Sequence, residues 1–145
     1  MKQGFVKVAA ASCAVAVADV RENTRVILET IHKMEDEGAK VMVLPELALT
    51  GYTCSDLFWQ SQMIDAAKEG LKEIANGTKG TDALIFVGLP WEQGGKLFNV
   101  AAVLCHGELL GVVPKKYLPN YNEFYELRHF TPGKEAVTTT EFFGK

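Results

Sequence analysis

Glu46 and Lys115 are the two residues whose positions first suggest chemistry. Glu46 follows the apolar run KVMVLP, and Lys115 comes directly after ELLGVVP. Both runs have the composition of buried strands, and open α/β sheets collect their ligand-binding residues at the carboxyl ends of the strands. A carboxylate at such a strand end could act as a general base. Taken alone, Glu46 could equally cap a neighbouring amide, and Lys115 alone would be a solvated surface charge.

The segment around Lys115, PKKYLPNYNEFYELRHF at residues 114–130, has an unusual composition for a loop. Surface loops favour Gly, Ser, Asn and Asp, because these residues supply turn geometry without strain. This segment instead carries three tyrosines, two lysines, two glutamates and two prolines. It is too aromatic to be an ordinary connection.

The chain begins with a β-α-β pattern. Residues 5–15 are nearly continuous small apolar sequence, as expected for a strand buried on both faces. Asn23 is a good N-cap for a helix that ends near Gly38, and residues 40–45 form a second short strand. We therefore predict two parallel strands joined by a helix. A secretory signal is the alternative for the first residues, but Lys7 interrupts the apolar run.

A second helix and three further strands complete the pattern. Apolar residues recur at helical spacing along one face of this helix: Met63, Ile64, Ala67, Leu71 and Ile74. Residues 83–90 form the third strand, and residues 97–105 and 108–113 form an antiparallel pair. Residues 137–143 also resemble a strand. The order of the elements predicts an α/β fold, in one domain or part of one.

The composition excludes several classes of protein. The formal net charge of the 145 residues is -3, with 15 basic and 18 acidic side chains and no basic block, so we expect no nucleic-acid partner. No apolar run reaches the length of a membrane span, so we expect no membrane partner either. Neither a dinucleotide-binding glycine motif nor a phosphate-binding P-loop is present.

The cysteines and histidines provide no complete site of their own. Cys13, Cys54 and Cys105 are odd in number and widely spaced, which fits neither a disulfide framework nor a zinc site and favours a reducing cytoplasm. We therefore expect no metal. Cys105 is followed by a histidine, but adjacent strand residues point to opposite faces, so the two are a poor dyad. His129 lies beside the aromatic segment and could contact the pocket, although we expect it to be solvated.

Together, three motifs resemble those of a known superfamily. These are LPELALTGY at residues 44–52, DLF at residues 56–58 and PKKYLPNYNEFYE at residues 114–126. They closely resemble the nitrilase, or carbon-nitrogen hydrolase, superfamily, and within it the glutaminase domain of glutamine-dependent NAD synthetases. The resemblance extends over nearly the whole chain. It implies an α-β-β-α sandwich, of which residues 1–145 would be an incomplete N-terminal portion.

The resemblance also implies roles for individual residues. The family uses a Glu-Lys-Cys triad, in which Glu46 would be the general base and Lys115 would stabilise the oxyanion. Glu126 aligns with a second family glutamate that holds the lysine. Tyr52, Tyr121 and Phe124 align with positions that the family places around the glutamine substrate. The family spacing selects Lys115 over Lys116, which should be the exposed neighbour.

The nucleophile of the resemblance is missing. The family cysteine lies several tens of residues beyond the lysine, and none of the three cysteines occupies that place. We therefore expect residues 1–145 to be inactive alone and to depend on downstream sequence. The resemblance implies a synthetase domain of the same parent chain, which would bind ATP and Mg, and a homo-oligomer. Two alternatives stay open: another nitrilase-branch amidase, or a non-catalytic binding or assembly module.

Overall fold

A computed structural model describes residues 4–142 and 144 of the chain. It contains a five-stranded sheet with the strand order β1-β2-β3-β4-β5. Strands β1 (Val8–Ala10), β2 (Val41–Val43) and β3 (Leu84–Gln93) are parallel. Strands β4 (Lys96–Cys105) and β5 (Glu108–Pro114) continue the sheet in antiparallel order. The predicted α/β class, the parallel pairing of the first two strands and the antiparallel pairing of the last two are therefore confirmed.

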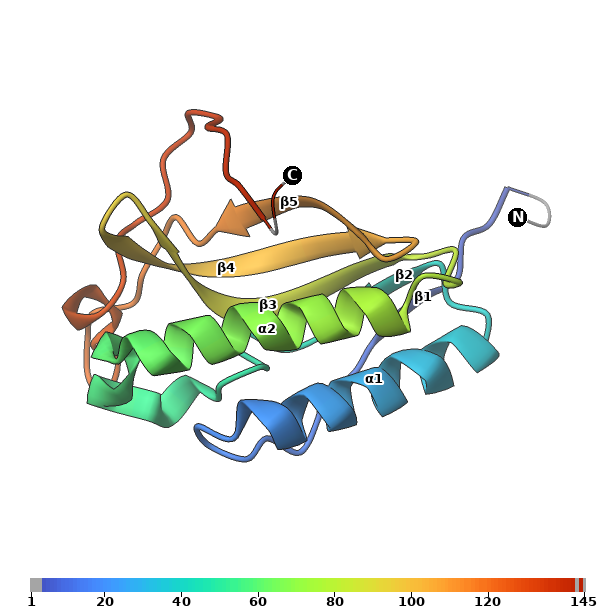
Figure 1. The fold of residues 1–145 in the computed structure, drawn as a ribbon, viewed down its shortest axis with the longest axis horizontal. Helices are drawn as coiled ribbons and strands as arrows, with labels where there is room; N and C mark the ends of the chain where they lie inside the picture. Colours follow the sequence, from blue (N-terminus) through green and yellow to red (C-terminus); the bar gives the residue numbers. More distant parts are fainter. Residues whose placement is uncertain (1–3, 143, 145) are drawn as a thin grey trace.

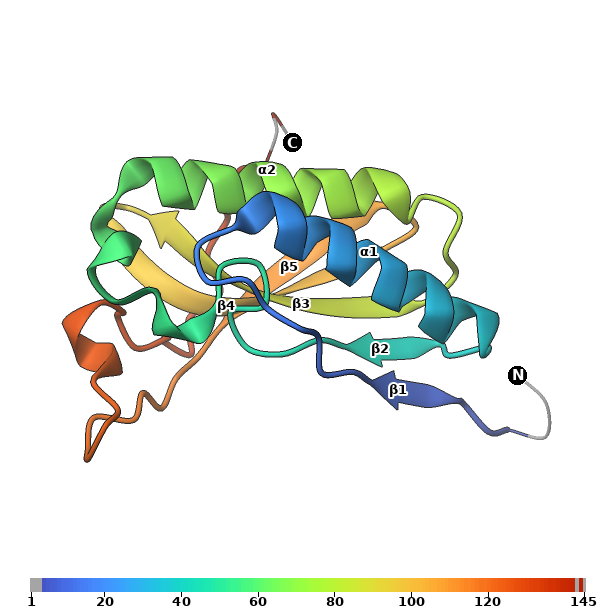
Figure 2. The same cartoon turned by 90° about the horizontal axis from the view of Figure 1, so that it is seen from below.

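Two helices cover one face of the sheet (Figures 1 and 2). They are α1 (Val20–Asp36) and α2 (Ser61–Gly77), and each buries one apolar side. Ile31 and Leu71 on the helices are fully buried together with Met42, Ile85 and Val87 on the strands. Ile85 and Val87 are two positions apart on β3, so both point toward the helices, as the strand period requires. The core thus lies between the helical layer and the sheet.

The opposite face of the sheet is also apolar, but it is partly open. The strand pairing places Val43 and Phe86 side by side, and both lie on the face away from the buried Met42 and Ile85. Val8, Val43, Leu84 and Val113 are all exposed. An apolar sheet face of this kind normally packs against a further layer. The arrangement is consistent with one half of the predicted sandwich.

The first strand is shorter and more exposed than predicted. Only Val8–Ala10 pair with β2, and Val8 is exposed. The prediction of a strand over residues 5–15 that is buried on both faces is therefore wrong. The reason is position: β1 lies at the edge of the sheet, and among the described residues no strand pairs with its other side. Small apolar composition does not distinguish an edge strand from a central one.

The start of α1 also differs from the prediction. Asp19, not Asn23, is the N-cap, and its carboxylate accepts a hydrogen bond from the Glu22 amide at 3.0 Å. Asn23 is buried inside the first turn. Its side-chain amide donates to the carbonyls of Ala16 and Leu49 at 2.8 and 3.0 Å, and its oxygen accepts from the Ala16 amide at 2.8 Å.

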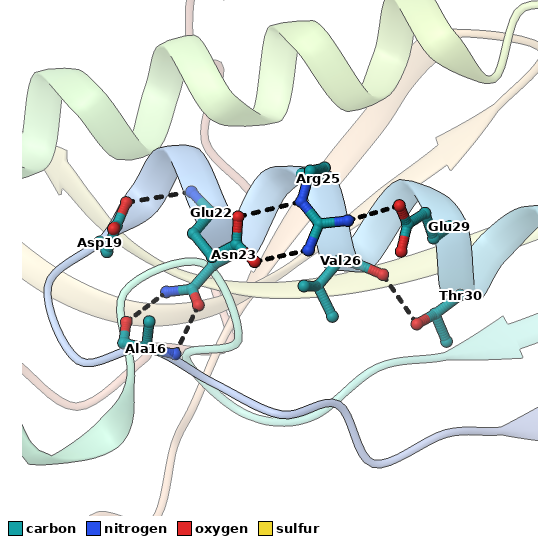
Figure 3. A network of polar contacts seen from close by, with 8 residues as sticks. All are labelled: Ala16, Asp19, Glu22, Asn23, Arg25, Val26, Glu29 and Thr30. Carbon is teal, nitrogen blue, oxygen red and sulfur yellow. Dashed lines mark hydrogen bonds and ion pairs between the residues drawn. The ribbon is translucent and has the colours of Figure 1, made fainter.

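Asn23 therefore holds the segment before α1 against the loop that follows β2. Figure 3 shows its paired contacts with Ala16, beside the exposed ion pairs that Arg25 makes with Glu22 and Glu29. Buried amides that use their donors and acceptors in this way fix the relative position of the segments they join. One of these segments carries Glu46.

The predicted strand over residues 137–143 is absent from residues 137–142, and Phe143 lies outside the described residues. Val137 is fully exposed, and the segment has an irregular backbone. Phe142 packs on Trp91 with ring centroids 5.8 Å apart, and Gln93 donates to the Thr139 carbonyl at 2.9 Å. The β propensity of this segment finds no neighbouring strand among the described residues, so it stays unpaired.

The β4–β5 pair contains one irregularity. Leu104 pairs with Leu109, but Val103 pairs with Gly111, so Leu110 is an extra residue on β5. This is a β-bulge, in which two residues of one strand oppose one residue of the other. Beyond it the pairing runs regularly to Val100 and Pro114, directly before Lys115.

Candidate active site

Three charged side chains predicted to act together meet in one cluster. The Nζ atom of Lys115 lies 2.8 Å from Oε1 of Glu46 and 2.9 Å from Oε1 of Glu126. Glu46 comes from the loop after β2, Lys115 follows β5, and Glu126 begins the short 3-10 helix η2 (Glu126–Arg128). Widely separated parts of the sequence therefore bring two carboxylates onto one ammonium group.

Backbone hydrogen bonds determine the direction of Lys115. Its amide donates to the Asn99 carbonyl at 2.8 Å, which extends the β4–β5 pairing by one residue, and its carbonyl accepts from the Gly133 amide at 2.9 Å. Lys116 turns away and forms an ion pair with Glu135 at 2.5 Å. The side chain of Lys115 is 30% exposed and that of Lys116 is 46% exposed. The geometry agrees with the choice of Lys115 as the residue facing the cluster.

The loop that carries Glu46 passes unusually close to β3. A Cβ atom added at Gly88 would lie 2.4 Å from the Pro45 carbonyl oxygen and 2.5 Å from the Leu47 amide nitrogen. The Leu49 amide donates to the Gly88 carbonyl at 3.2 Å, which holds the loop at this distance. Position 88 must therefore be glycine for the backbone around Glu46 to take this path.

We expect Gly88→Ala to displace the Glu46 loop. The added methyl group meets backbone atoms that cannot rotate away, so the free energy of unfolding should fall by about 1–3 kcal/mol. Gly111→Ala is the matched control, because it lies on β5 and its added Cβ would meet no atom within 4 Å. Denaturant unfolding of both variants checks the prediction, and equal losses at the two positions would contradict it.

Asn99 is a site residue that sequence analysis missed. It lies on β4, is 3% exposed, and its side-chain amide donates to Oε1 of Glu46. An amide inside an apolar strand is costly to bury unless it is hydrogen-bonded. The signal was therefore present in LFNVAAVLC, where Asn99 is the polar residue of an otherwise apolar run.

Glu126 is the buried member of the cluster, at 4% exposure. Its Oε1 accepts from Lys115 and also from the hydroxyl of Tyr52 at 2.8 Å. Burial raises the pKa of the Tyr52 hydroxyl, and the hydrogen bond to Glu126 and the nearby carboxylates raise it further. Tyr52 therefore stays protonated and remains a hydrogen-bond donor at neutral pH.

The charge of Lys115 is also secured by its surroundings. Burial alone would lower the pKa of its ammonium group, but the hydrogen bonds and negative charges of Glu46 and Glu126 outweigh burial and raise it above its ordinary value of 10.5. The ammonium is therefore charged at neutral pH. Its contribution to stability is present below pH 10.5 and is lost only as the pH rises through the higher value of the folded protein.

The predicted substrate residues form a row of aromatic rings next to Glu126. The rings of Tyr52 and Phe124 meet edge to face with centroids 6.4 Å apart, and Phe124 meets Tyr121 in the same way at 5.7 Å. Tyr52 begins the 3-10 segment η1 (Tyr52–Trp59), and Tyr121 and Phe124 belong to the segment after β5. Tyr121 is well exposed.

A cavity of about 290 Å³ lies beside this row, between η1 and η2. It is lined by Tyr52, Glu126 and His129 among others. The side chain of His129 is 10% exposed and packs against Phe58 and Trp59 at ring distances of 5.7 Å. The prediction that His129 is solvated is wrong, because the aromatic rings of η1 cover it.

A larger groove of about 1070 Å³ lies elsewhere, between the end of α2, β5 and residues 134–142. Its lining includes none of Glu46, Lys115 and Glu126. The charged cluster, and not this groove, is therefore the candidate active site.

The three cysteines stand apart from this chemistry. Cys54 is buried and its thiol donates to the Thr50 carbonyl at 2.9 Å. Burial raises the pKa of the Cys54 thiol, which opposes formation of the nucleophilic thiolate. Cys13 is part-buried with its sulfur 3.5 Å from the Thr30 hydroxyl, and Cys105 ends β4 at the hairpin.

The described residues contain neither a membrane-spanning helix nor a metal-binding cluster. Among them, no helix is long and apolar enough to cross a membrane. No group of three or more His, Cys, Asp or Glu side chains in the same residues is arranged to hold a metal ion.

Comparisons with known proteins show what this chain is similar to. The glutamine-dependent NAD(+) synthetase of Mycobacterium tuberculosis is 36% identical over 132 residues, which are 91% of this chain and 19% of that protein. The crystal structure of a glutamine-dependent NAD(+) synthetase from Cytophaga hutchinsonii matches with a TM-score of 0.87 and 31% identity over 94% of this chain and 23% of that one. An amidase from Nesterenkonia sp. shares the fold, with a TM-score of 0.77 and 24% identity over 93% of this chain and 51% of that one.

The chain thus spans about a fifth of the length of the synthetases that it resembles. The predicted nitrilase-like fold is confirmed by these neighbours. The family profile described as carbon-nitrogen hydrolase matches residues 7–143, so the chain belongs to the carbon-nitrogen hydrolase family.

Proposed function

We propose that residues 1–145 are the N-terminal part of a glutaminase domain that releases ammonia from glutamine for NAD synthesis from deamido-NAD. The observation that carries the proposal is the Lys115 ammonium held between Glu46 and Glu126 beside an aromatic row. The 36% identity to glutamine-dependent NAD synthetases supports glutamine as the substrate. A cysteine supplied by downstream sequence completes the triad in this proposal.

The first half of the reaction forms a thioester. Glu46 takes the thiol proton, and the sulfur attacks the carboxamide carbon of glutamine. The carbonyl oxygen becomes an oxyanion, which the Lys115 ammonium stabilises. Within the part of the chain that the structure describes, two carboxylates occupy two of the three N–H donors of Lys115, so the third can serve the oxyanion. Glu46 then returns its proton to the leaving nitrogen, and ammonia departs.

The second half hydrolyses the thioester. Glu46 removes a proton from water, the hydroxide oxygen attacks the thioester carbon, and Lys115 again stabilises the oxyanion. The carbon-sulfur bond breaks and the thiolate takes the proton from Glu46. Glutamate leaves, and the enzyme returns to its starting state.

The aromatic row positions the substrate in this proposal. Tyr52, Tyr121 and Phe124 border the cluster, so they can contact the aliphatic part of glutamine while its amide reaches Lys115. Glu126 holds both Lys115 and the Tyr52 hydroxyl, and so aligns the charged and aromatic parts of the site.

We propose that the steps of NAD synthesis other than glutamine hydrolysis take place outside residues 1–145. ATP and Mg belong to a synthetase domain of the same parent chain, which would consume the ammonia, and no residue of 1–145 is proposed to hold them. We further propose a cytoplasmic enzyme that assembles as a homo-oligomer. Light scattering of the complete polypeptide tests the assembly.

The test uses the complete polypeptide, meaning residues 1–145 with the downstream sequence that the proposal requires. We expect it to make NAD from deamido-NAD with either glutamine or ammonium as the nitrogen source, and to release ammonia from glutamine. Residues 1–145 alone should release none above a blank without protein. Tyr121→Ala should weaken glutamine-dependent synthesis and leave ammonium-dependent synthesis intact, because only glutamine uses this pocket.

Other outcomes of this test would favour other functions. Hydrolysis of simple amides but not of glutamine would favour another amidase of the family. No hydrolysis of any amide by the complete polypeptide would favour a binding or assembly module. Ammonia release by residues 1–145 alone, lost on Glu46→Ala, would contradict the requirement for a downstream cysteine.

A further inference from the structure

Glu46 Oε1 receives two hydrogen-bond donors at once. Lys115 Nζ donates to it at 2.8 Å, and the side-chain amide of Asn99 donates to the same oxygen. Among the described residues, no hydrogen bond reaches the other oxygen, Oε2. The side chain of Glu46 is 41% exposed, so the carboxylate is not enclosed by the protein.

Asn99 is well placed to hold this carboxylate still. It lies in the middle of β4 and is almost fully buried, so its side chain has little freedom of its own. Its backbone carbonyl accepts from the Lys115 amide at 2.8 Å, while its side chain reaches Glu46. One strand residue thus ties both members of the Glu46–Lys115 pair to the sheet.

We propose that Asn99 is a positioning residue that fixes the Glu46 carboxylate through Oε1, so that Oε2 is the oxygen that accepts the proton of the nucleophile. An oxygen with two donors is less able to accept a proton than one with none, because each donor stabilises its negative charge. A carboxylate held by Lys115 alone could rotate and exchange its two oxygens. Asn99 prevents this rotation. The inference rests on the proposed function for its kinetic consequences only, since the hydrogen bond can be tested without turnover.

The charged and titratable groups around Glu46 set the background for any pH effect. Lys115 contacts it directly, Glu126 shares the Lys115 ammonium, and the Tyr52 hydroxyl feels its charge. None of these groups is removed by a change of the Asn99 side chain. The backbone bond from Lys115 to residue 99 is also kept, so a substitution at Asn99 isolates the contact with Glu46.

The first experiment observes the hydrogen bond itself. In protein labelled with ¹⁵N-asparagine, we expect the side-chain amide signal of Asn99, identified by its absence in Asn99→Leu, to move as Glu46 is protonated at acidic pH. Glu46→Gln should abolish this movement. A signal that moves identically in Glu46→Gln, or does not move in the unsubstituted protein, would overturn the proposal whether or not glutamine is the substrate.

The second experiment measures glutamine hydrolysis by the complete polypeptide. In Asn99→Leu we expect kcat to fall about 10- to 100-fold with a small change in KM. This loss is smaller than the full rate contribution of a general base, because Glu46 is still present but less well positioned. The acidic limb of the kcat/KM profile should move to higher pH, because the carboxylate loses a donor. Asn99→Asp should lose more, since a second carboxylate would face Glu46, and ammonium-dependent synthesis should be unchanged in both variants.

Asn23→Leu is the matched structural control. Asn23 is as deeply buried as Asn99 and binds only backbone atoms of Ala16 and Leu49. We expect Asn23→Leu to lower the unfolding temperature of the protein without moving the acidic limb of the kcat/KM profile. An Asn99→Leu protein that folds normally and keeps the unsubstituted pH profile would overturn the proposal, as would an equal shift of the limb in Asn23→Leu.

Discussion

Lys115→Ala in the complete polypeptide should abolish measurable glutamine hydrolysis, whereas Lys116→Ala should leave it nearly unchanged. Loss of one oxyanion donor typically lowers kcat by roughly 100- to 1000-fold. The loss here should be larger, because Lys115 also separates the two carboxylates of Glu46 and Glu126. Without the ammonium, the two negative charges would face each other with no positive charge between them. Steady-state ammonia release from glutamine measures both variants.

Lys116 is the internal control for this prediction. It has the same charge and adjoins Lys115 in the sequence, but it pairs with Glu135 outside the cluster. Ammonium-dependent NAD synthesis should survive in both variants, which excludes general unfolding as the cause. Comparable losses of glutamine hydrolysis in the two variants would show that the strand register assigns the wrong lysine.

A glutamine-derived diazoketone should label one cysteine of the complete polypeptide, and that cysteine should lie downstream of Lys145. The diazo carbon takes a proton, and a bond then forms between this carbon and the thiolate sulfur as dinitrogen leaves. Only a thiol beside Glu46 is activated for this reaction. Replacing that cysteine with alanine should remove all labelling and all glutamine hydrolysis. Intact-mass analysis and peptide mapping locate the adduct.

Three further alanine variants complete the labelling experiment. Cys13→Ala, Cys54→Ala and Cys105→Ala should each leave labelling intact, since none of these residues belongs to the charged cluster. Cys54 is the most informative of the three, because it lies in η1 two residues after Tyr52. Labelling that disappears in Cys54→Ala would overturn both the assignment of the nucleophile and the requirement for downstream sequence.

Local patterns were sufficient to predict the helices and the central strands. The apolar faces of α1 and α2 and the nearly continuous apolar runs of β3 and β4 reflect burial directly, so these elements could be predicted from the sequence. The choice of Lys115 over Lys116 came from the family spacing, and the local pattern adds only that neighbouring residues point to opposite sides. The structure brings Glu46, Lys115 and Glu126 together, as the resemblance implied.

Tertiary contacts determine the features that local sequence patterns did not predict. Asp and Asn are comparable N-caps. Here Asp19 is the N-cap, because the side-chain amide of Asn23 donates instead to the carbonyls of Ala16 and Leu49. The role of Asn99 depends on a contact with Glu46 across 53 positions of sequence. Neither contact has a local signature beyond a polar residue in a buried place.

The β-bulge at Leu110 has a consequence for how the length of this protein can vary. Lys115 faces inward because a fixed number of residues separates it from the bulge, counted along the pairing of Gly111 with Val103 and Pro114 with Val100. An insertion or deletion of one residue in that interval would exchange the inward and outward sides and present Lys116 to the glutamates. An extra residue at the Gly94-Gly95 turn would leave this count untouched, since that turn lies at the other end of β4. Length changes among homologous chains should therefore gather in the turns and spare residues 111–115.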